Sequence, residues 1–225
     1  MNRYAPELAL VAGGLLGIVF GGFVLVSLGE FYSAVVVCAL LAYPFAAYAI
    51  RTDDEPTTVL PPREVTIVAG LAAVGVIVDM LRLSAPTIES LLVGTLLALL
   101  VFLPVTAYAT WYGTPPAWLT PRRVETGGTL LAVGLLAGGL GGGAATPGAI
   151  SAVAVFVAAM LFAARSTGVS PRRRRLVPAA GLLAAAGLLA VGIVSGGPLD
   201  PWVTTALGAA FGPLLYIALM TSGRT

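Results

Sequence analysis

Long apolar runs occupy most of the chain, and short polar segments separate them. Eight of these runs approach the roughly 18 to 20 residues that a helix needs to cross the hydrocarbon core of a bilayer. The expected spans are Glu7–Leu28, Phe31–Ile50, Glu64–Leu83, Ile88–Tyr112, Val124–Leu140, Ile150–Ala164, Leu176–Ser195 and Pro201–Thr221. The pattern predicts an all-α polytopic membrane protein of about eight transmembrane helices, arranged as four helical hairpins.

The fifth and sixth spans are the weakest of the eight. Glycines at 138, 139, 141, 142 and 143 weaken the end of the fifth helix, and the apolar run around Phe156 is short. An architecture of seven spans, or one with a re-entrant segment, is the alternative that this part of the chain leaves open.

The arginines are distributed unequally between the two sides that eight spans define. On the side of the two termini lie Arg3, Arg51, Arg63, Arg122, Arg123, Arg165, Arg172, Arg173, Arg174, Arg175 and Arg224. Arg82 falls on the opposite side. Because basic residues concentrate in cytoplasmic loops, this distribution predicts a multi-pass protein of the cell membrane with both termini in the cytoplasm.

Composition narrows the chemistry that the chain can perform. The 225 residues are 58% hydrophobic and 10% charged, so eight spans leave no room for a soluble domain, and we expect a single membrane domain over residues 1–225. All basic residues are Arg, and without His or Lys there is no histidine base or haem ligand and no lysine Schiff base. Cys38 is the one cysteine and is expected to pack as a small hydrophobe. We therefore expect no enzymatic activity and no cofactor, and a net charge of +2 gives no reason to expect a nucleic acid partner.

Similar dipeptides at the ends of three polar loops suggest an internal repeat. They are Pro62-Arg63, Pro121-Arg122 and Pro171-Arg172, and each precedes an apolar run that contains glycine. One hairpin for each repeat gives units at approximately 1–60, 61–118, 119–168 and 169–225. Since each unit contains two spans, an axis along the membrane normal would relate the copies. The alternative is a generic polytopic protein whose loops resemble one another because all of them anchor in headgroups.

Prolines inside three spans predict kinks. Each is followed about one turn later by a tyrosine, as Pro44 and Tyr48, Pro104 and Tyr108, and Pro213 and Tyr216. A proline lacks the N–H that would bond the carbonyl four residues earlier, here Leu40, Leu100 and Ala209. In lipid, a neighbouring helix, a hydroxyl or water must cover such a carbonyl.

Two further groups of residues are candidates for packing and for lipid contact. Gly13, Gly17 and Gly21 lie on one face of the first helix, where small residues let another backbone approach closely. This face fits either packing inside the bundle or an oligomer interface. The tract Arg172, Arg173, Arg174 and Arg175 is expected to contact lipid headgroups, as a topological anchor or as an anionic lipid site.

Asp79 and Arg82 are the most informative ionisable residues. They are three apart on one helix, and Asp79 lies about four residues, or about 6 Å, inside the expected end of its span. A carboxylate at that depth needs a partner, so we expect a structural ion pair in which the loss of one member costs more than the loss of both. The acidic run Asp53, Asp54 and Glu55 is expected to be solvated loop and not a metal site.

These observations favour a non-enzymatic membrane subunit or scaffold. Its expected partners are membrane lipid and, through the glycine-rich helix faces, other proteins or copies of itself in a homo- or hetero-oligomer. The alternative is a small-solute permease or channel with a path between the hairpins near the three prolines. A scaffold predicts a dry bundle centre, whereas a permease predicts a continuous polar seam.

Overall fold

The chain is helical, with no strand, throughout the residues 4–53, 55–167 and 171–222 that the computed structural model describes. Eight of these helices are long and apolar enough to cross a membrane. Each of them contains one of the eight runs expected from the sequence. The fifth and sixth runs form α6 (Pro121–Gly141) and α7 (Ala145–Thr167), so the prediction of eight helices long and apolar enough to span is confirmed, and neither of the two weak runs is interrupted.

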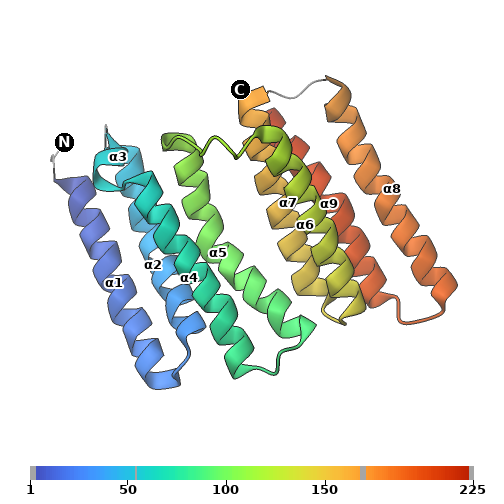
Figure 1. The fold of residues 1–225 in the computed structure, drawn as a ribbon, viewed down its shortest axis with the longest axis horizontal. Helices are drawn as coiled ribbons and strands as arrows, with labels where there is room; N and C mark the ends of the chain where they lie inside the picture. Colours follow the sequence, from blue (N-terminus) through green and yellow to red (C-terminus); the bar gives the residue numbers. More distant parts are fainter. Residues whose placement is uncertain (1–3, 54, 168–170, 223–225) are drawn as a thin grey trace. The chain divides into compact units, whose positions relative to one another are not determined.

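The chain divides into two compact units, of which the first comprises Met1–Ala85 and Leu97–Pro115. It contains α1 (Ala5–Leu28), α2 (Phe31–Thr52), the single-turn α3 (Pro56–Val59), α4 (Pro62–Leu83) and the later part of α5 (Ile88–Tyr112). In this unit α1 packs along α2, and α2 also contacts α4 (Figure 1). A core of Ala73, Val76 and Ala98 joins α4 to α5, with Tyr32 and Phe102 packed against it.

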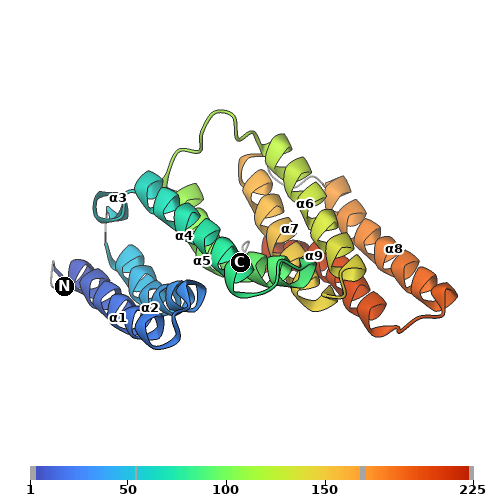
Figure 2. The ribbon, with the colours of Figure 1, turned by 60° about the horizontal axis from the view of Figure 1, so that its bottom comes forward.

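The second unit comprises Pro86–Leu96 and Pro116–Thr225. It contains the start of α5 together with α6, α7, α8 (Pro171–Ser195) and α9 (Asp200–Ser222). Helix α7 packs against both α6 and α9, and α8 packs against α9 (Figure 2). More than half of the α7 span is buried, which makes α7 the central helix of this unit.

Proline and glycine mark the ends of the helices. In the described part of the chain, six helices, α1, α3, α4, α6, α8 and α9, have proline at their first or second position, where the missing N–H would have no partner within the helix in any case. The turns after α1, α6 and α8 contain Gly29, Gly143 and Gly196, whose φ angles are +70°, +71° and +67°. A side chain would strain this left-handed conformation, so these three tight turns require glycine.

The helices expose apolar side chains on most of their circumference. On α1 alone, Leu8, Val11, Ile18, Phe23 and Val26 are all more than half exposed. Such a surface is unfavourable in water and suits the hydrocarbon of a bilayer, where helix pairs need only small contact faces. The fold is therefore that of a multi-pass membrane protein.

Two segments differ from the sequence-based expectation. The acidic loop leads into the helical turn α3, and the seventh helix begins at Pro171, five residues before the expected span. The arginine tract therefore lies on the first turns of α8. The start of a helix carries partial positive charge, which disfavours arginine.

Candidate functional site

Asp79 joins two helices of the first unit at the end where α2 begins. Its Oδ1 lies 3.2 Å from a guanidinium nitrogen of Arg82, and its Oδ2 accepts a hydrogen bond of 3.0 Å from the backbone N–H of Tyr32. The Asp79 side chain is 8% exposed and that of Arg82 is 67% exposed. The buried carboxylate is thus bonded on both sides, whereas the arginine reaches outward to solvent or headgroups.

The contact with Tyr32 makes Asp79 a helix cap supplied by another helix. Tyr32 is the second residue of α2, and its N–H is one of the four at a helix start that have no partner within the helix. A carboxylate there satisfies the donor and interacts favourably with the helix dipole. Glu30, the residue before α2, accepts a hydrogen bond of 2.7 Å from the Ser33 hydroxyl, so its carboxylate is used by Ser33. Sequence reasoning missed the bond to Tyr32, because 47 residues separate it from Asp79.

Gly13, Gly17 and Gly21 are buried against α2 of the same chain. A Cβ on Gly17 would lie 2.9 Å from the Cys38 carbonyl oxygen, and one on Gly21 would lie 2.8 Å from the Ala34 carbonyl oxygen. Real Cβ atoms do not approach backbone so closely. These glycines therefore hold α1 and α2 together, and their face is not free for a partner protein.

Glycine also makes the closest contacts between helices in the second unit. A Cβ on Gly139 of α6 would lie 3.0 Å from the Ala144 carbonyl oxygen, and one on Gly148 of α7 would lie 2.7 Å from the Leu135 carbonyl oxygen. Between α8 and α9, a Cβ on Gly181 would lie 2.8 Å from the Ala209 carbonyl oxygen. Ala209 is four residues before Pro213, so a neighbouring helix covers the carbonyl that this proline frees.

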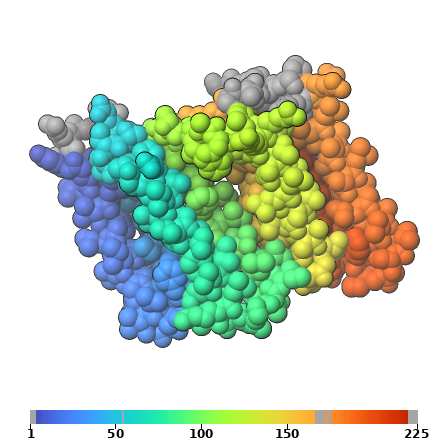
Figure 3. All heavy atoms as spheres, in the orientation of Figure 1, coloured from blue at the N-terminus to red at the C-terminus, as the bar shows by residue number. Residues whose placement is uncertain are grey.

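One glycine face of α6 has no neighbour among the described residues of the second unit. Gly127, Gly134, Gly138 and Gly141 have no atom within 4 Å of their Cβ positions. Their spacings of seven, four and three residues put them on one side of the helix. The exposed side chains of Leu130 and Leu131 flank this face, which we call the open α6 face. Figure 3 shows α6, in yellow-green to yellow, on the side of the second unit that is turned to the viewer.

The three prolines lie inside helices, and their surroundings differ. Pro44 is in α2, Pro104 in α5 and Pro213 in α9. Near Pro104, the Tyr43 hydroxyl of α2 donates a hydrogen bond to the Val101 carbonyl, one residue after the carbonyl that the proline frees. Pro178, inside α8, is a fourth interior proline that the shorter expected span had placed near its start.

Tyr108 ties α5 to the segment between α2 and α4. Its hydroxyl oxygen lies 2.6 Å from the Leu60 carbonyl and 3.1 Å from the Pro56 carbonyl, so its single proton bonds one of the two at a time. Its ring packs on that of Tyr112 at 5.1 Å between centroids. The repeat of proline and tyrosine singled out this residue, but no sequence pattern indicated its partners on the α3 turn.

The remaining candidates take no part in these contacts. Arg172 and Arg175 are exposed, and the side chains of Arg173 and Arg174 lie outside the described residues, as does Asp54. The Asp53 carboxylate accepts a bond from the Glu55 backbone N–H, a local turn. Within the described residues, no group of three or more His, Cys, Asp or Glu side chains could hold a metal ion.

Among the described residues, four polar or charged side chains are buried: Asp79, Ser90, Ser151 and Thr205. Ser90 caps the start of α5 through reciprocal bonds with Thr87, and the Thr205 hydroxyl bonds the Pro201 carbonyl of its own helix. The Ser151 hydroxyl, in the middle of the second unit, has no hydrogen-bond partner. Three of the four buried groups therefore have hydrogen-bond partners, Ser90 and Thr205 within their own helix regions and Asp79 on another helix.

Comparisons with protein families, with curated proteins and with solved structures find no match to this chain.

Proposed function

We propose that this chain is a non-enzymatic membrane subunit that associates in the plane of the bilayer through the open α6 face, with a partner membrane protein or with a second copy. The observation that carries the proposal is the contrast between two sets of glycines. The face of α1 that holds Gly13, Gly17 and Gly21 is covered by α2, whereas four glycines on α6 line one side of a helix with no atom of their own unit against them. Small residues at such spacing allow the close backbone approach on which helix association in lipid depends.

The character of the two cores supports a scaffold over a permease. The buried side chains of each unit are mainly Ala, Val and Leu, and structural hydrogen bonds account for Asp79, Ser90 and Thr205. The unpartnered Ser151 hydroxyl favours the alternative, a small-solute path near the helix prolines. A hydrated seam that joins Ser151 to both surfaces would be required for that alternative.

The finer architecture belongs to the same proposal. It has four hairpins repeated about an axis along the membrane normal. Both termini lie in the cytoplasm and all four arginines of the tract lie at the headgroups, in agreement with the distribution of eleven arginines against one. The direct packing of α1 on α2, α6 on α7 and α8 on α9 supports three of the four hairpins, whereas α4 packs along α2 more than along α5. Gly75 of α4 lies against the Phe31 ring of α2, so the glycine of the second hairpin, α4 and α5, contacts a helix of the first hairpin.

Leucine substitutions on α6 test the proposal without a steric effect on the fold. Gly134→Leu with Gly138→Leu should weaken association in bilayers at least about ten-fold, measured by single-molecule photobleaching of labelled protein in vesicles. The matched control is Gly22→Leu, an exposed glycine of α1 that also has nothing within 4 Å of its Cβ position. Its association should equal that of the wild type.

Native mass spectrometry after gentle extraction identifies the partner. A homo-oligomer or a co-purifying membrane protein that is lost in the α6 double variant supports the proposal. A wild type that is monomeric without a partner, or association that the double variant leaves unchanged, contradicts it.

A further inference from the structure

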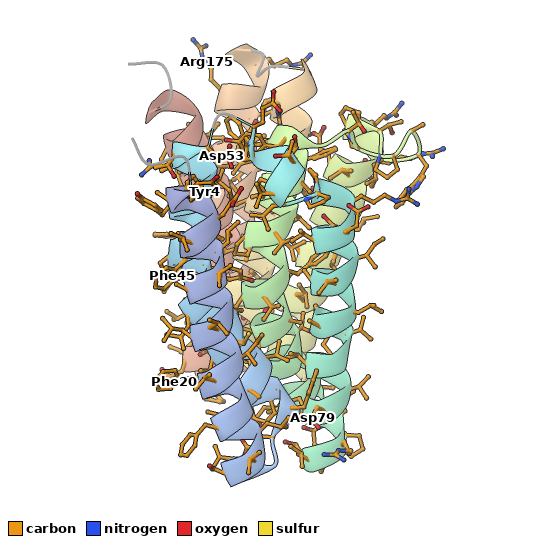
Figure 4. The ribbon with its side chains drawn as sticks, turned by 90° about the vertical axis from the view of Figure 1, so that its left-hand side faces the viewer. Tyr4, Phe20, Phe45, Asp53, Asp79 and Arg175 are labelled. Atoms are coloured by element: carbon orange, nitrogen blue, oxygen red, sulfur yellow. The ribbon has the colours of Figure 1, made fainter. Side chains whose placement is uncertain are left out.

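A shallow apolar groove runs between α1 and α2 at the end of the first unit where α1 begins. It has a volume of about 580 Å³, and its lining residues are Ala5, Leu8 and Ala9 of α1 and Pro44, Phe45 and Tyr48 of α2. Apolar atoms provide almost all of the lining. Figure 4 shows Tyr4 and Asp53 at this end, Phe45 further along the helices, and Asp79 at the opposite end.

The walls of the groove are held in place by contacts already described for the α1–α2 pair. Phe45 packs on Gly13, where an added Cβ would come within 2.6 Å of the Phe45 Cβ. Pro44 has a fixed ring and needs no hydrogen bond from its own nitrogen. The small residues Ala5 and Ala9 leave the space that larger residues would fill. The groove is therefore a preformed feature of two tightly packed helices.

Polar groups lie at the mouth of the groove. Tyr48 is half exposed, and the exposed Arg51 follows it by three residues, on the same side of α2. Phe45 is six residues from Arg51, or about 9 Å along the helix axis. Glu7 lies on the side of α1 away from Ala5 and Ala9, and the Asp53 carboxylate is turned to the Glu55 N–H. The charge nearest to the mouth along α2 is thus positive.

We propose that this groove binds one anionic phospholipid, with an acyl chain against Pro44 and Phe45 and the phosphate at Arg51 and the Tyr48 hydroxyl. The order of the groups along the groove, from apolar wall to hydroxyl to guanidinium, matches the order from acyl chain to glycerol to phosphate in a lipid. Arginine binds phosphate through paired N–H donors, and tyrosine suits the boundary between hydrocarbon and headgroup. The volume lies within the range of small-molecule sites in proteins. The proposal is independent of the open α6 face, which lies in the other unit.

The experiment uses the full chain reconstituted into vesicles of phosphatidylcholine and phosphatidylglycerol in equal amounts, extracted gently and analysed by native mass spectrometry. The wild type should retain one phosphatidylglycerol in preference to phosphatidylcholine. Arg51→Gln should lower this preference about five-fold, the effect of one basic residue near an anionic surface. The control Arg63→Gln removes an exposed arginine from the start of α4 and should leave the preference unchanged.

A second pair of variants tests the groove itself. Ala9→Phe fills the apolar space and should abolish retention of the lipid, whereas Val11→Phe changes an exposed residue of α1 outside the groove and should not. A benzophenone amino acid in place of Leu8 should crosslink to phosphatidylglycerol more than to phosphatidylcholine, and this measurement needs no change in the groove-filling residues. Equal retention of the two lipids by the wild type, or equal retention of phosphatidylglycerol by Ala9→Phe and Val11→Phe, would overturn the proposal.

Discussion

Removal of the Asp79 carboxylate should destabilise the first unit chiefly through the start of α2, and only secondarily through Arg82. The carboxylate accepts from the Tyr32 N–H at 3.0 Å and is buried, so Asp79→Ala leaves a helix-start donor without a partner. Loss of a capping acceptor costs about 1 kcal/mol, and loss of a negative charge at a partly buried helix start costs up to about as much again. We expect a decrease of about 2 kcal/mol in the free energy of unfolding.

The partner substitution should cost much less. The Arg82 side chain is 67% exposed, and an exposed ion pair contributes about 0 to 1 kcal/mol. Asp79→Asn keeps an acceptor for Tyr32 but loses the charge, so about 1 kcal/mol is expected. The bond to Tyr32 also revises the expectation from the sequence that the loss of both partners would be milder than the loss of one. The double variant loses the cap as well and should match Asp79→Ala.

Equilibrium unfolding in mixed micelles measures this order, with Val78→Ala as a control on the exposed side of the same helix. Hydrogen exchange gives a local readout, because the protection of the amides at the start of α2 should fall in Asp79→Ala and persist in Arg82→Ala. If Arg82→Ala costs as much as Asp79→Ala, or if protection at the start of α2 does not change, the capping argument is wrong.

Three other predictions follow from the contacts. Gly17→Leu should lower the free energy of unfolding by about 3 kcal/mol in the same assay, because its side chain would meet the Cys38 carbonyl. Gly14→Leu, with open space around it, should cost less than about 1 kcal/mol, and equal costs would contradict the packing. Tyr108→Phe removes the bond to the α3 turn, so it should lower the free energy of unfolding by about 1 kcal/mol and speed proteolysis between Asp53 and Pro61. The control Tyr112→Phe should not speed this cleavage, and equal cleavage rates in the two variants would refute the role of the hydroxyl. With Cys38 replaced, single cysteines at Asp53, Trp118 and Ser170, the last outside the described residues, should resist an impermeant thiol reagent added to intact cells. A cysteine at Ala85 should react with it, and labelling of the first three from outside would reverse the proposed topology.

The sequence alone was sufficient to predict the eight helices, and the reason is physical. In lipid every backbone polar group must be bonded within its own segment, so a long apolar run has essentially one available structure. The same argument is local, and it does not extend to contacts between helices. Spacing along one helix predicted that Asp79 could reach Arg82, but nothing local pointed to the Tyr32 N–H. Likewise Gly17 and Gly134 look alike in the sequence, and only the structure separates the covered glycine from the open one.

The repeated prolines and tyrosines show how far a sequence pattern constrains a membrane fold. Tyr48 is half exposed beside an apolar groove, whereas Tyr108 and Tyr216 are buried. A proline fixes where the backbone lacks a donor, and the neighbouring helix decides how the freed carbonyl is covered. At Pro213 the cover is the close approach of Gly181, whereas near Pro104 the Tyr43 hydroxyl bonds the neighbouring Val101 carbonyl. If the four hairpins descend from one unit, their helix boundaries have kept a common pattern while these contacts have diverged. Function should therefore be sought in what differs between the pairs, which in this chain are the open α6 face and the groove beside Pro44.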